Sequence, residues 1–292
     1  MSEAYRISSP ISYIPTHLTL IRRDHGKVVA KSSATGFLWH RAGDYFLVTN
    51  LHNVTGWDAD RNVALSDQGW LPNEILVPLA FRERPGPDGR FAFARAAQGS
   101  ALTNSAGEPR WLVHPHYGSK VDVAVLLLGK LKPEDFVTHV KNPHEWELAT
   151  QPANECPEWM PFQENAGDDA YVIGFPFGMD GGHEFPIWKR ASIASEPDLN
   201  LGGLPKLLID TATRKGMSGS PVIVVRRGAI QQPDSDMWVG QAPDLLGVYS
   251  GRLGDDPLGV QLGVVWKKRV IDEIIDGGTL GRWPWDPSFS QP

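Results

Sequence analysis

Apolar residues in this chain gather into short runs that are separated by Gly, Pro, Asn and Asp. Val, Ile, Leu and aromatic residues dominate the runs and favour strands, whereas the separating residues favour turns. This pattern predicts an all-β protein. The predicted strands lie at 18–22, 36–39, 45–50, 74–79, 111–114, 122–128, 170–175, 188–195, 206–210, 222–226, 245–249 and 260–266.

The last apolar cluster has a different period. Val270, Ile271, Ile274 and Ile275 fall on one face of a helix, and two glycines follow at 277–278. Glycine directly after an apolar helical stripe commonly ends a helix. We therefore predict a short C-terminal helix over residues 267–276.

Two stretches break the strand pattern. Residues 131–168 carry several prolines and little alternation, which indicates a crossover between two β-rich halves. The chain is thus divided into 1–130, the crossover 131–168, a second half 169–266, and a helix and tail at 267–292. Residues 82–110 carry Pro-Gly-Pro-Asp-Gly at 85–89 and are expected to form a long loop, with gating of a functional site as a hypothesis.

Composition narrows the class of protein. The 292 residues carry a net charge of −6 with acids and bases interspersed, so no nucleic-acid partner is expected. The single cysteine, Cys156, cannot form an intrachain disulfide and is expected to be structural. Residues 1–13 do not read as a signal peptide, and no apolar run reaches membrane-spanning length. We therefore expect a cytoplasmic protein with no membrane association, no cofactor and no metal site.

The strongest chemical signal is the segment Gly-Met-Ser-Gly-Ser-Pro-Val at 216–222. A serine hydroxyl attacks a carbonyl only if a base removes its proton, and the resulting oxyanion needs N–H donors. Glycine before the serine lets the backbone turn so that two amides can face one point. Ser218 is the candidate nucleophile, and the amides of Gly216 and Ser218 are the candidate oxyanion hole. A Ser/Gly-rich turn without chemistry is the plain alternative.

The candidate base is His52, which follows the buried-looking run at 45–50. No histidine follows Ser218, which excludes the Ser–Asp–His order of an α/β-hydrolase. His40, His114 and His116 are weaker alternatives because none ends so strong a strand.

The candidate third member is Asp122, at the start of the apolar run 122–128. An acid beside such a run requires a partner, because burying an unpaired carboxylate is costly. In this role it would orient the imidazole of His52 and stabilise its charged form.

With these residues in place, the sequence resembles the trypsin-like (chymotrypsin-fold) serine peptidases, in particular bacterial intracellular members. The matching segments are Leu-Val-Thr-Asn-Leu-His-Asn-Val (47–54), Asp-Val-Ala-Val-Leu (122–126) and Gly-Met-Ser-Gly-Ser-Pro-Val (216–222), in His–Asp–Ser order. Further similar segments lie at 172–178, 246–251 and 263–266, so the resemblance covers roughly residues 35–276.

The resemblance implies two antiparallel six-stranded β-barrels with a cleft between them. The first barrel (1–130) would carry His52 and Asp122, and the second (169–266) would carry Ser218. It also implies a serine endopeptidase that acts through an acyl-enzyme on a polypeptide substrate.

Departures from the family pattern concern activation and specificity. Met217 replaces the acid that pairs with a newly cleaved N-terminus in digestive members, so activation by cleavage is not expected. Ala212 replaces the acid that gives trypsin-like specificity, and a basic side chain buried without a partner is costly. We expect cleavage after small or neutral residues. The substrate-binding residues implied by the resemblance are Ala212, Thr213, Ser250, Gly251 and Gly263.

Two alternatives to the peptidase remain from the sequence. One is a catalytically silent relative that uses the same cleft to bind peptides. The other is an esterase that uses the same three residues. Restraint of an intracellular peptidase by a regulatory protein partner is a further expectation.

Overall fold

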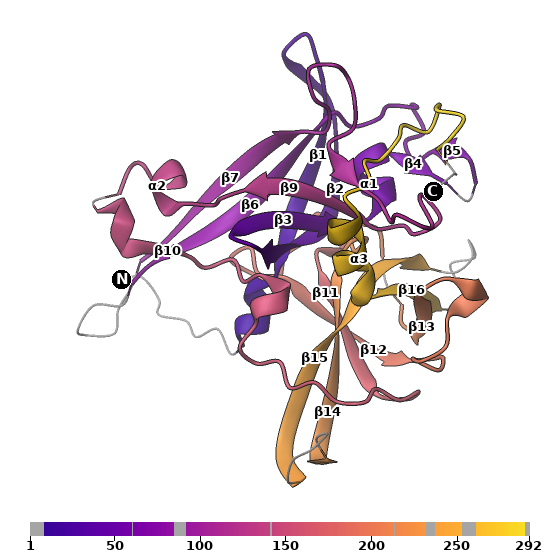
Figure 1. The fold of residues 1–292 in the computed structure, drawn as a ribbon. Helices are drawn as coiled ribbons and strands as arrows, with labels where there is room; N and C mark the ends of the chain where they lie inside the picture. The colour runs from indigo at the N-terminus through magenta and orange to yellow at the C-terminus, as the bar shows by residue number, and fades with distance from the viewer. Residues whose placement is uncertain are drawn as a thin grey trace.

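A computed structural model describes residues 9–59, 61–84, 92–140, 142–212, 214–231, 237–252 and 261–289. Figure 1 shows two β-rich units, one above the other, with the C-terminal helix α3 (Arg269–Gly277) between them. Each strand range predicted from the sequence overlaps a strand of the structure, and the predicted helix overlaps α3. The all-β class with a short C-terminal helix is therefore confirmed.

The described part of the first unit forms an eight-stranded antiparallel sheet in the order β10-β6-β1-β2-β3-β9-β8, with β7 on β6. This differs from the expected six strands. The additional short strands β4 and β5 form a separate pair. The bounds are β1 (Pro15–Asp24), β2 (Lys27–Arg41), β3 (Asp44–Thr49), β4 (Trp57–Asp58), β5 (Val63–Ala64), β6 (Glu74–Glu83), β7 (Phe93–Ala101), β8 (Trp111–Leu112), β9 (Ala124–Gly129) and β10 (Trp146–Leu148).

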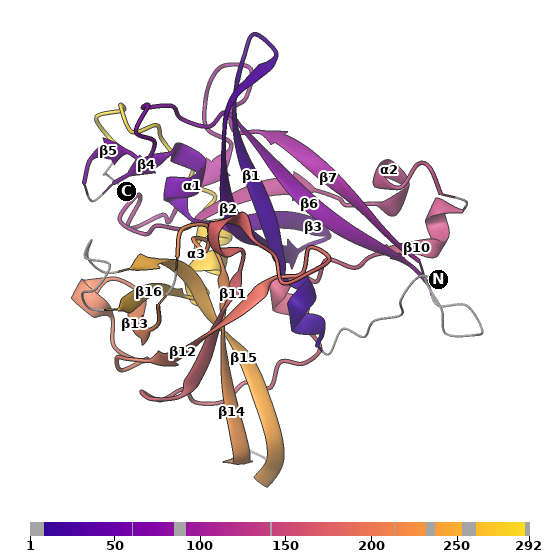
Figure 2. The same cartoon turned by 180° about the vertical axis from the view of Figure 1, so that it is seen from behind.

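The second unit is a closed six-stranded barrel in the order β11-β12-β13-β16-β15-β14, as the family resemblance implies. Strands β14 and β15 continue past the barrel as a long two-stranded ribbon (Figures 1 and 2). The bounds are β11 (Asp169–Gly174), β12 (Ile187–Ile193), β13 (Lys206–Asp210), β14 (Pro221–Gln231), β15 (Met237–Arg252) and β16 (Leu262–Lys267). The short helices are α1 (Leu51–Thr55), α2 (Pro133–Phe136), η1 (Pro10–Tyr13), η2 (Pro143–Glu145), η3 (Ala153–Glu155), η4 (Pro176–Gly178) and η5 (Leu201–Gly203).

The expectation of a long loop over 82–110 was wrong for its central part. Strand β7 pairs with β6 along its whole length, from Phe93 opposite Arg82 to Ala101 opposite Glu74. Its side chains are mostly Ala, Gly, Ser and Gln, and they alternate between exposed and half-buried. The sequence signal was weak because strands are usually recognised by β-branched and aromatic residues. A strand fixed in the sheet is not a free gate; residues 85–91 lie outside the described part of the chain.

Three apolar clusters hold the molecule together. One lies inside the first unit and one inside the barrel. The third joins the two units and α3, and its fully buried members include Phe37, Val48, Ile173, Ile223 and Ile274. Burial of apolar surface stabilises by roughly 25 cal/mol per Å². The two units are therefore fixed against each other by a shared core.

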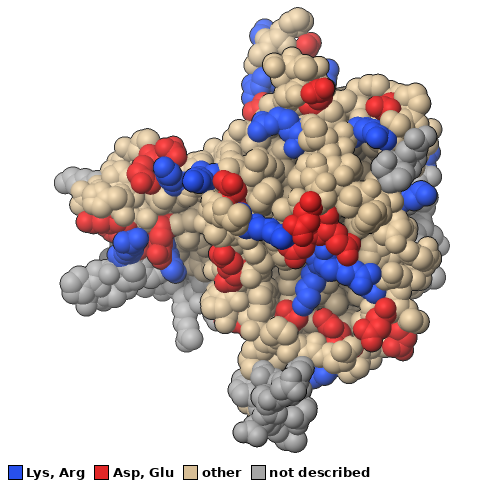
Figure 3. Space-filling view, in the orientation of Figure 1, with Lys and Arg blue, Asp and Glu red and all other residues tan. Residues whose placement is uncertain are grey.

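Polar contacts add to the docking of α3. Asp272 accepts hydrogen bonds from Trp39 and Arg41 of β2, and Arg41 also pairs with Asp276 at 2.7 Å. Acidic and basic side chains lie next to one another across the face seen in Figure 3. None of the described helices has the length and apolar character needed to cross a bilayer.

Candidate active site

His52 lies on the short helix α1, directly after strand β3. The strand ends at Thr49, and α1 ends at Gly56, whose left-handed backbone (φ 66°) lets its amide bond to the carbonyl oxygen of His52. Glycine suits this position because a left-handed residue costs it little. The side chain of His52 is 19% exposed. The rigid end of a buried strand thus holds this imidazole at the surface between the two units.

Asp122 lies opposite His52 and is bound to it twice. Its Oδ2 is 2.6 Å from His52 Nδ1, and its Oδ1 accepts the backbone amide of His52 at 2.9 Å. The hydroxyl of Ser250 also donates to Oδ2, and the Asn50 side chain donates to the Asp122 carbonyl at 2.6 Å. With Nδ1 engaged by a carboxylate, the Nε2 atom of His52 is left to act on another group.

The surroundings shift the pKa of His52. Burial lowers it, but the negative charge of Asp122 and the hydrogen bond to it act in the opposite direction, with a smaller contribution from Asp58. The net pKa lies above the ordinary value of 6.5. Asp122 therefore stabilises the imidazolium form of His52. Such stabilisation suits a histidine that accepts a proton during a reaction.

Ser218 lies in the turn that precedes β14, and its backbone is bound to the first unit. Its carbonyl oxygen accepts the Thr35 amide at 3.0 Å and the Asn53 side chain at 3.2 Å. Gly219 has a φ of 85°, and a Cβ there would collide with the Thr35 carbonyl oxygen. Since Asn53 follows His52 on α1, the same helix that carries the imidazole also fixes the turn with the serine.

The structure brings all three candidate residues to one junction, but it joins only two of them directly. Within the described part of the chain, no hydrogen bond connects the hydroxyl of Ser218 with the His52 ring. Such bonds are often long in unliganded enzymes and tighten when substrate binds.

The two candidate oxyanion amides belong to a loop whose carbonyl oxygens are held by hydrogen bonds from other segments. Lys215 O accepts the Phe177 amide at 2.7 Å, and Gly216 O accepts the Thr35 hydroxyl at 2.8 Å. In a trans peptide the N–H points opposite to the C=O, so the Gly216 amide is directed away from Phe177. Among the described residues, the amides of Gly216 and Ser218 have no hydrogen-bond partner.

Gly216 is required by this arrangement. Its φ is 92°, and a Cβ there would lie 2.5 Å from the Phe175 carbonyl oxygen. The glycine that the sequence indicated thus serves a close backbone approach as well as a turn.

The residues proposed to bind substrate come from different elements of the second unit. Ala212 is half-buried after β13, and Gly263 on β16 faces Tyr249, whose Cε2 would be 2.6 Å from a Cβ at that glycine. Gly251 has a φ of 142° and pairs with Val264. Ser250 is also bound to Asp122, a contact that the sequence did not indicate. Thr213 lies outside the described residues.

Sequence reasoning missed three contributors: Thr35, Asn53 and Phe177. Thr35 is fully buried and joins the Gly216 carbonyl to the Phe175 amide through its hydroxyl. The hydrogen bonds of the Thr35 hydroxyl, and the one from the Asn53 side chain to Ser218, join residues at least 140 positions apart in the chain, whereas the Phe177 amide meets Lys215 across 38 positions. No local pattern marks them; only the position of Asn53 next to His52 offered a hint.

Thiol and metal chemistry have no support in the described residues. Cys156 is buried, and burial, the largest effect, raises the pKa of its thiol to about 11, so it is not a reactive thiolate. In the described part of the chain, no group of three or more His, Cys, Asp or Glu side chains is placed to hold a metal ion.

Comparisons with known proteins give structural likeness without sequence relatives. No family model matches the chain. No curated protein sequence matches it. Among solved structures, the chain is similar to Rv3671c of M. tuberculosis, described as a protease in its active form, at 17% identity and a TM-score of 0.44, over 94% of this chain and 84% of that one. An inactive form of Rv3671c with a serine-to-alanine substitution matches at 15% identity and a TM-score of 0.43, over 92% of this chain and 90% of that one.

Proposed function

We propose that this protein is a serine endopeptidase in which Ser218 is the nucleophile, His52 the general base and Asp122 the residue that orients and stabilises the imidazole. The observation that carries the proposal is the pairing of His52 Nδ1 with Asp122 at 2.6 Å, beside a serine whose backbone is bound to the same helix. A carboxylate that accepts three hydrogen bonds is rigidly held, as an orienting group should be.

The proposed reaction proceeds in two halves. Ser218 Oγ forms a bond to the scissile carbonyl carbon while its proton passes to His52 Nε2, and the carbonyl electron pair moves onto oxygen. The amides of Gly216 and Ser218 stabilise that oxyanion. On collapse the C–N bond breaks, and His52 gives the proton to the leaving amine. Water then attacks the acyl-enzyme in the same manner, which releases the acid and restores Ser218.

The proposed substrate is a polypeptide cleaved after a small or neutral residue. Ala212 supplies no charge, and Gly263 is closed in by the ring of Tyr249. A lysine or arginine side chain would meet no carboxylate from these positions, and an unpaired buried cation is costly.

The test is covalent labelling with a fluorophosphonate probe on the wild type, on Ser218→Ala, and on Ser105→Ala as a matched control at an exposed serine. We expect labelling of the wild type and the control, and none of Ser218→Ala. Absence of labelling in folded wild type would contradict the peptidase and favour a silent peptide-binding relative.

A peptide-library digest then defines the reaction. Cleavage that disappears in Ser218→Ala and follows small or neutral residues supports the proposal. Hydrolysis of simple esters without peptide cleavage would favour an esterase, and frequent cleavage after Lys or Arg would contradict the neutral pocket.

A further inference from the structure

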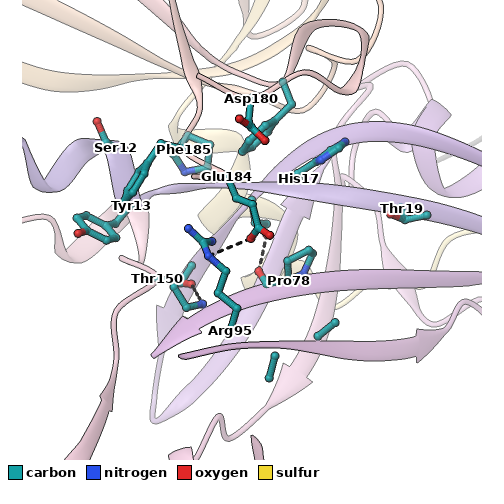
Figure 4. Close-up of a pocket in the computed structure, with 16 residues that line it drawn as sticks. Ser12, Tyr13, His17, Thr19, Pro78, Arg95, Thr150, Asp180, Glu184 and Phe185 are labelled. Carbon is teal, nitrogen blue, oxygen red and sulfur yellow. Dashed lines mark hydrogen bonds and ion pairs between the residues drawn. The ribbon is translucent and has the colours of Figure 1, made fainter. Parts of the chain in front are cut away.

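A cavity of about 420 Å³ opens where strands β1 and β6 separate, away from His52 and Ser218. The two strands pair only from Thr19 to Ile21 of β1. Beyond that point Pro78 of β6, which has no amide hydrogen, cannot continue the ladder, and the Thr16 hydroxyl binds its carbonyl oxygen instead at 2.6 Å. The segment between β11 and β12 covers the gap from the other unit (Figure 4).

Aromatic rings and charged groups share the walls of this cavity. The rings of Tyr13 and Phe185 meet edge to face, with centroids 5.1 Å apart. The guanidinium of Arg95 lies 5.8 Å from the Phe185 centroid and pairs with Glu184 at 2.9 Å. The cavity therefore already accommodates one cation against an aromatic face, an arrangement that is favourable in itself.

The walls of the cavity contain one more carboxylate than guanidinium group. Arg95 and Glu184 neutralise each other, whereas Asp180 makes no ion pair within the described residues and only accepts the Gly182 amide. His17, which also lines the cavity, has a pKa below its ordinary value because burial outweighs the attraction of Asp180 and Glu184. The described walls thus carry a net negative charge beside the rings of Tyr13 and Phe185, which suits a cationic group.

The same wall supports the loop beside Ser218. The Phe175 ring stacks on His17 with centroids 4.8 Å apart, while its amide donates to the Thr35 hydroxyl that holds the Gly216 carbonyl. Two residues further, the Phe177 amide holds the Lys215 carbonyl. Phe175 therefore lines the cavity with its side chain, while the amides of Phe175 and Phe177 take part in holding the candidate oxyanion loop.

We propose that this cavity is an effector site for a basic side chain, Lys or Arg, presented by a peptide, and that its occupation restrains the segment 175–185 and accelerates acylation of Ser218. The acceleration rests on the proposed function; the binding does not. A bound cation would lie between Asp180 and the aromatic walls. Contacts to both walls would reduce the motion of the segment that positions the Gly216 amide.

Binding is tested on the full chain as Ser218→Ala, which excludes cleavage, by calorimetric titration at low salt with acetyl-Gly-Lys-Gly-amide. We expect the norleucine analogue to bind more weakly, and Asp180→Asn to weaken the lysine peptide about threefold, as for a partly exposed ion pair. Asp67→Asn removes an exposed carboxylate elsewhere and is expected to leave binding unchanged. Equal affinity for the lysine and norleucine peptides would contradict the proposed site. Equal affinity of Asp180→Asn and Asp67→Asn for the lysine peptide would also contradict it.

Coupling is tested by the rate of fluorophosphonate labelling of otherwise wild-type chain with and without the lysine peptide. We expect faster labelling with peptide, and a smaller acceleration in Asp180→Asn at a peptide concentration near half-saturation of the wild type. An unchanged or slower rate with peptide bound would overturn the coupling. If no labelling occurs under any condition while binding still depends on Asp180, the proposed function is contradicted and the binding site is supported.

Discussion

The hydroxyl of Thr35 offers the sharpest test of how the two units position the candidate oxyanion loop. This fully buried side chain donates to the Gly216 carbonyl at 2.8 Å and accepts the Phe175 amide at 3.2 Å. Thr35→Val keeps the shape of the side chain and removes both bonds. Thr35→Ser keeps both bonds and removes only a methyl group, so it is the matched control.

The expected magnitudes follow from the burial of the two partners. The Phe175 amide is enclosed, since that residue is 2% exposed, and losing its acceptor costs about 1–3 kcal/mol. The carbonyl of half-buried Gly216 can reach water more easily and adds less. We expect Thr35→Val to lower the free energy of unfolding by about 2–3 kcal/mol, against about 1 kcal/mol for the methyl lost in Thr35→Ser.

The measurement is urea unfolding followed by tryptophan fluorescence and far-UV circular dichroism. A loss of 2–3 kcal/mol moves the midpoint of Thr35→Val by about 1 M urea. Fluorophosphonate labelling under native conditions should slow in Thr35→Val more than in Thr35→Ser. A valine variant as stable and as reactive as the serine variant would refute the role of these two hydrogen bonds.

Four further outcomes follow from the structure. Because Asp122 raises the pKa of His52 above 6.5, fluorophosphonate labelling should increase with pH through a midpoint above 6.5. Asp122→Asn should lower that midpoint, and an unchanged midpoint would contradict the pairing. Because the pKa of His52 is higher in the folded protein, the His52–Asp122 pair stabilises the fold fully below pH 6.5, and this stabilisation is lost as the pH rises through the folded pKa. Urea midpoints of the wild type and of Asp122→Asn, measured as a function of pH, check this. Gly216→Ala places a Cβ 2.5 Å from the Phe175 carbonyl oxygen in a left-handed backbone, so a destabilisation of about 1–3 kcal/mol is expected in the same unfolding assay; a wild-type midpoint would argue against the close approach. Cys156, with its thiol pKa raised to about 11, should resist iodoacetamide at pH 8 in the native protein and react in urea, and rapid native alkylation would show that the thiol is accessible.

The sequence correctly predicts the elements that a local pattern of apolar and turn residues determines. The strand that ends at Thr49 and the glycine-flanked Ser218 could be predicted because apolar runs and turn residues mark them directly. Strand β7 was missed because its small residues carry little strand preference, and the ribbon of β14 and β15 is longer than its apolar part. The roles of Thr35 and of the Ser250 hydroxyl were missed because they depend on which distant segments meet.

The position of Met217 bears on how the proposed peptidase becomes active. In digestive members of the family that the sequence resembles, an acid directly before the serine pairs with a newly cleaved N-terminus. Here that position is a fully buried methionine within the apolar cluster of the barrel, where it cannot serve as the partner of an ammonium group. The loop is instead bound by Thr35 and Phe177 through the carbonyl oxygens of Gly216 and Lys215, and Ser218 is bound by Thr35 and Asn53. Since these donors come from β2, α1 and the segment after β11, the order of the loop depends on the shared core between the two units. Under the proposed function, the loop that carries Ser218 is thus ordered by contacts that form on folding.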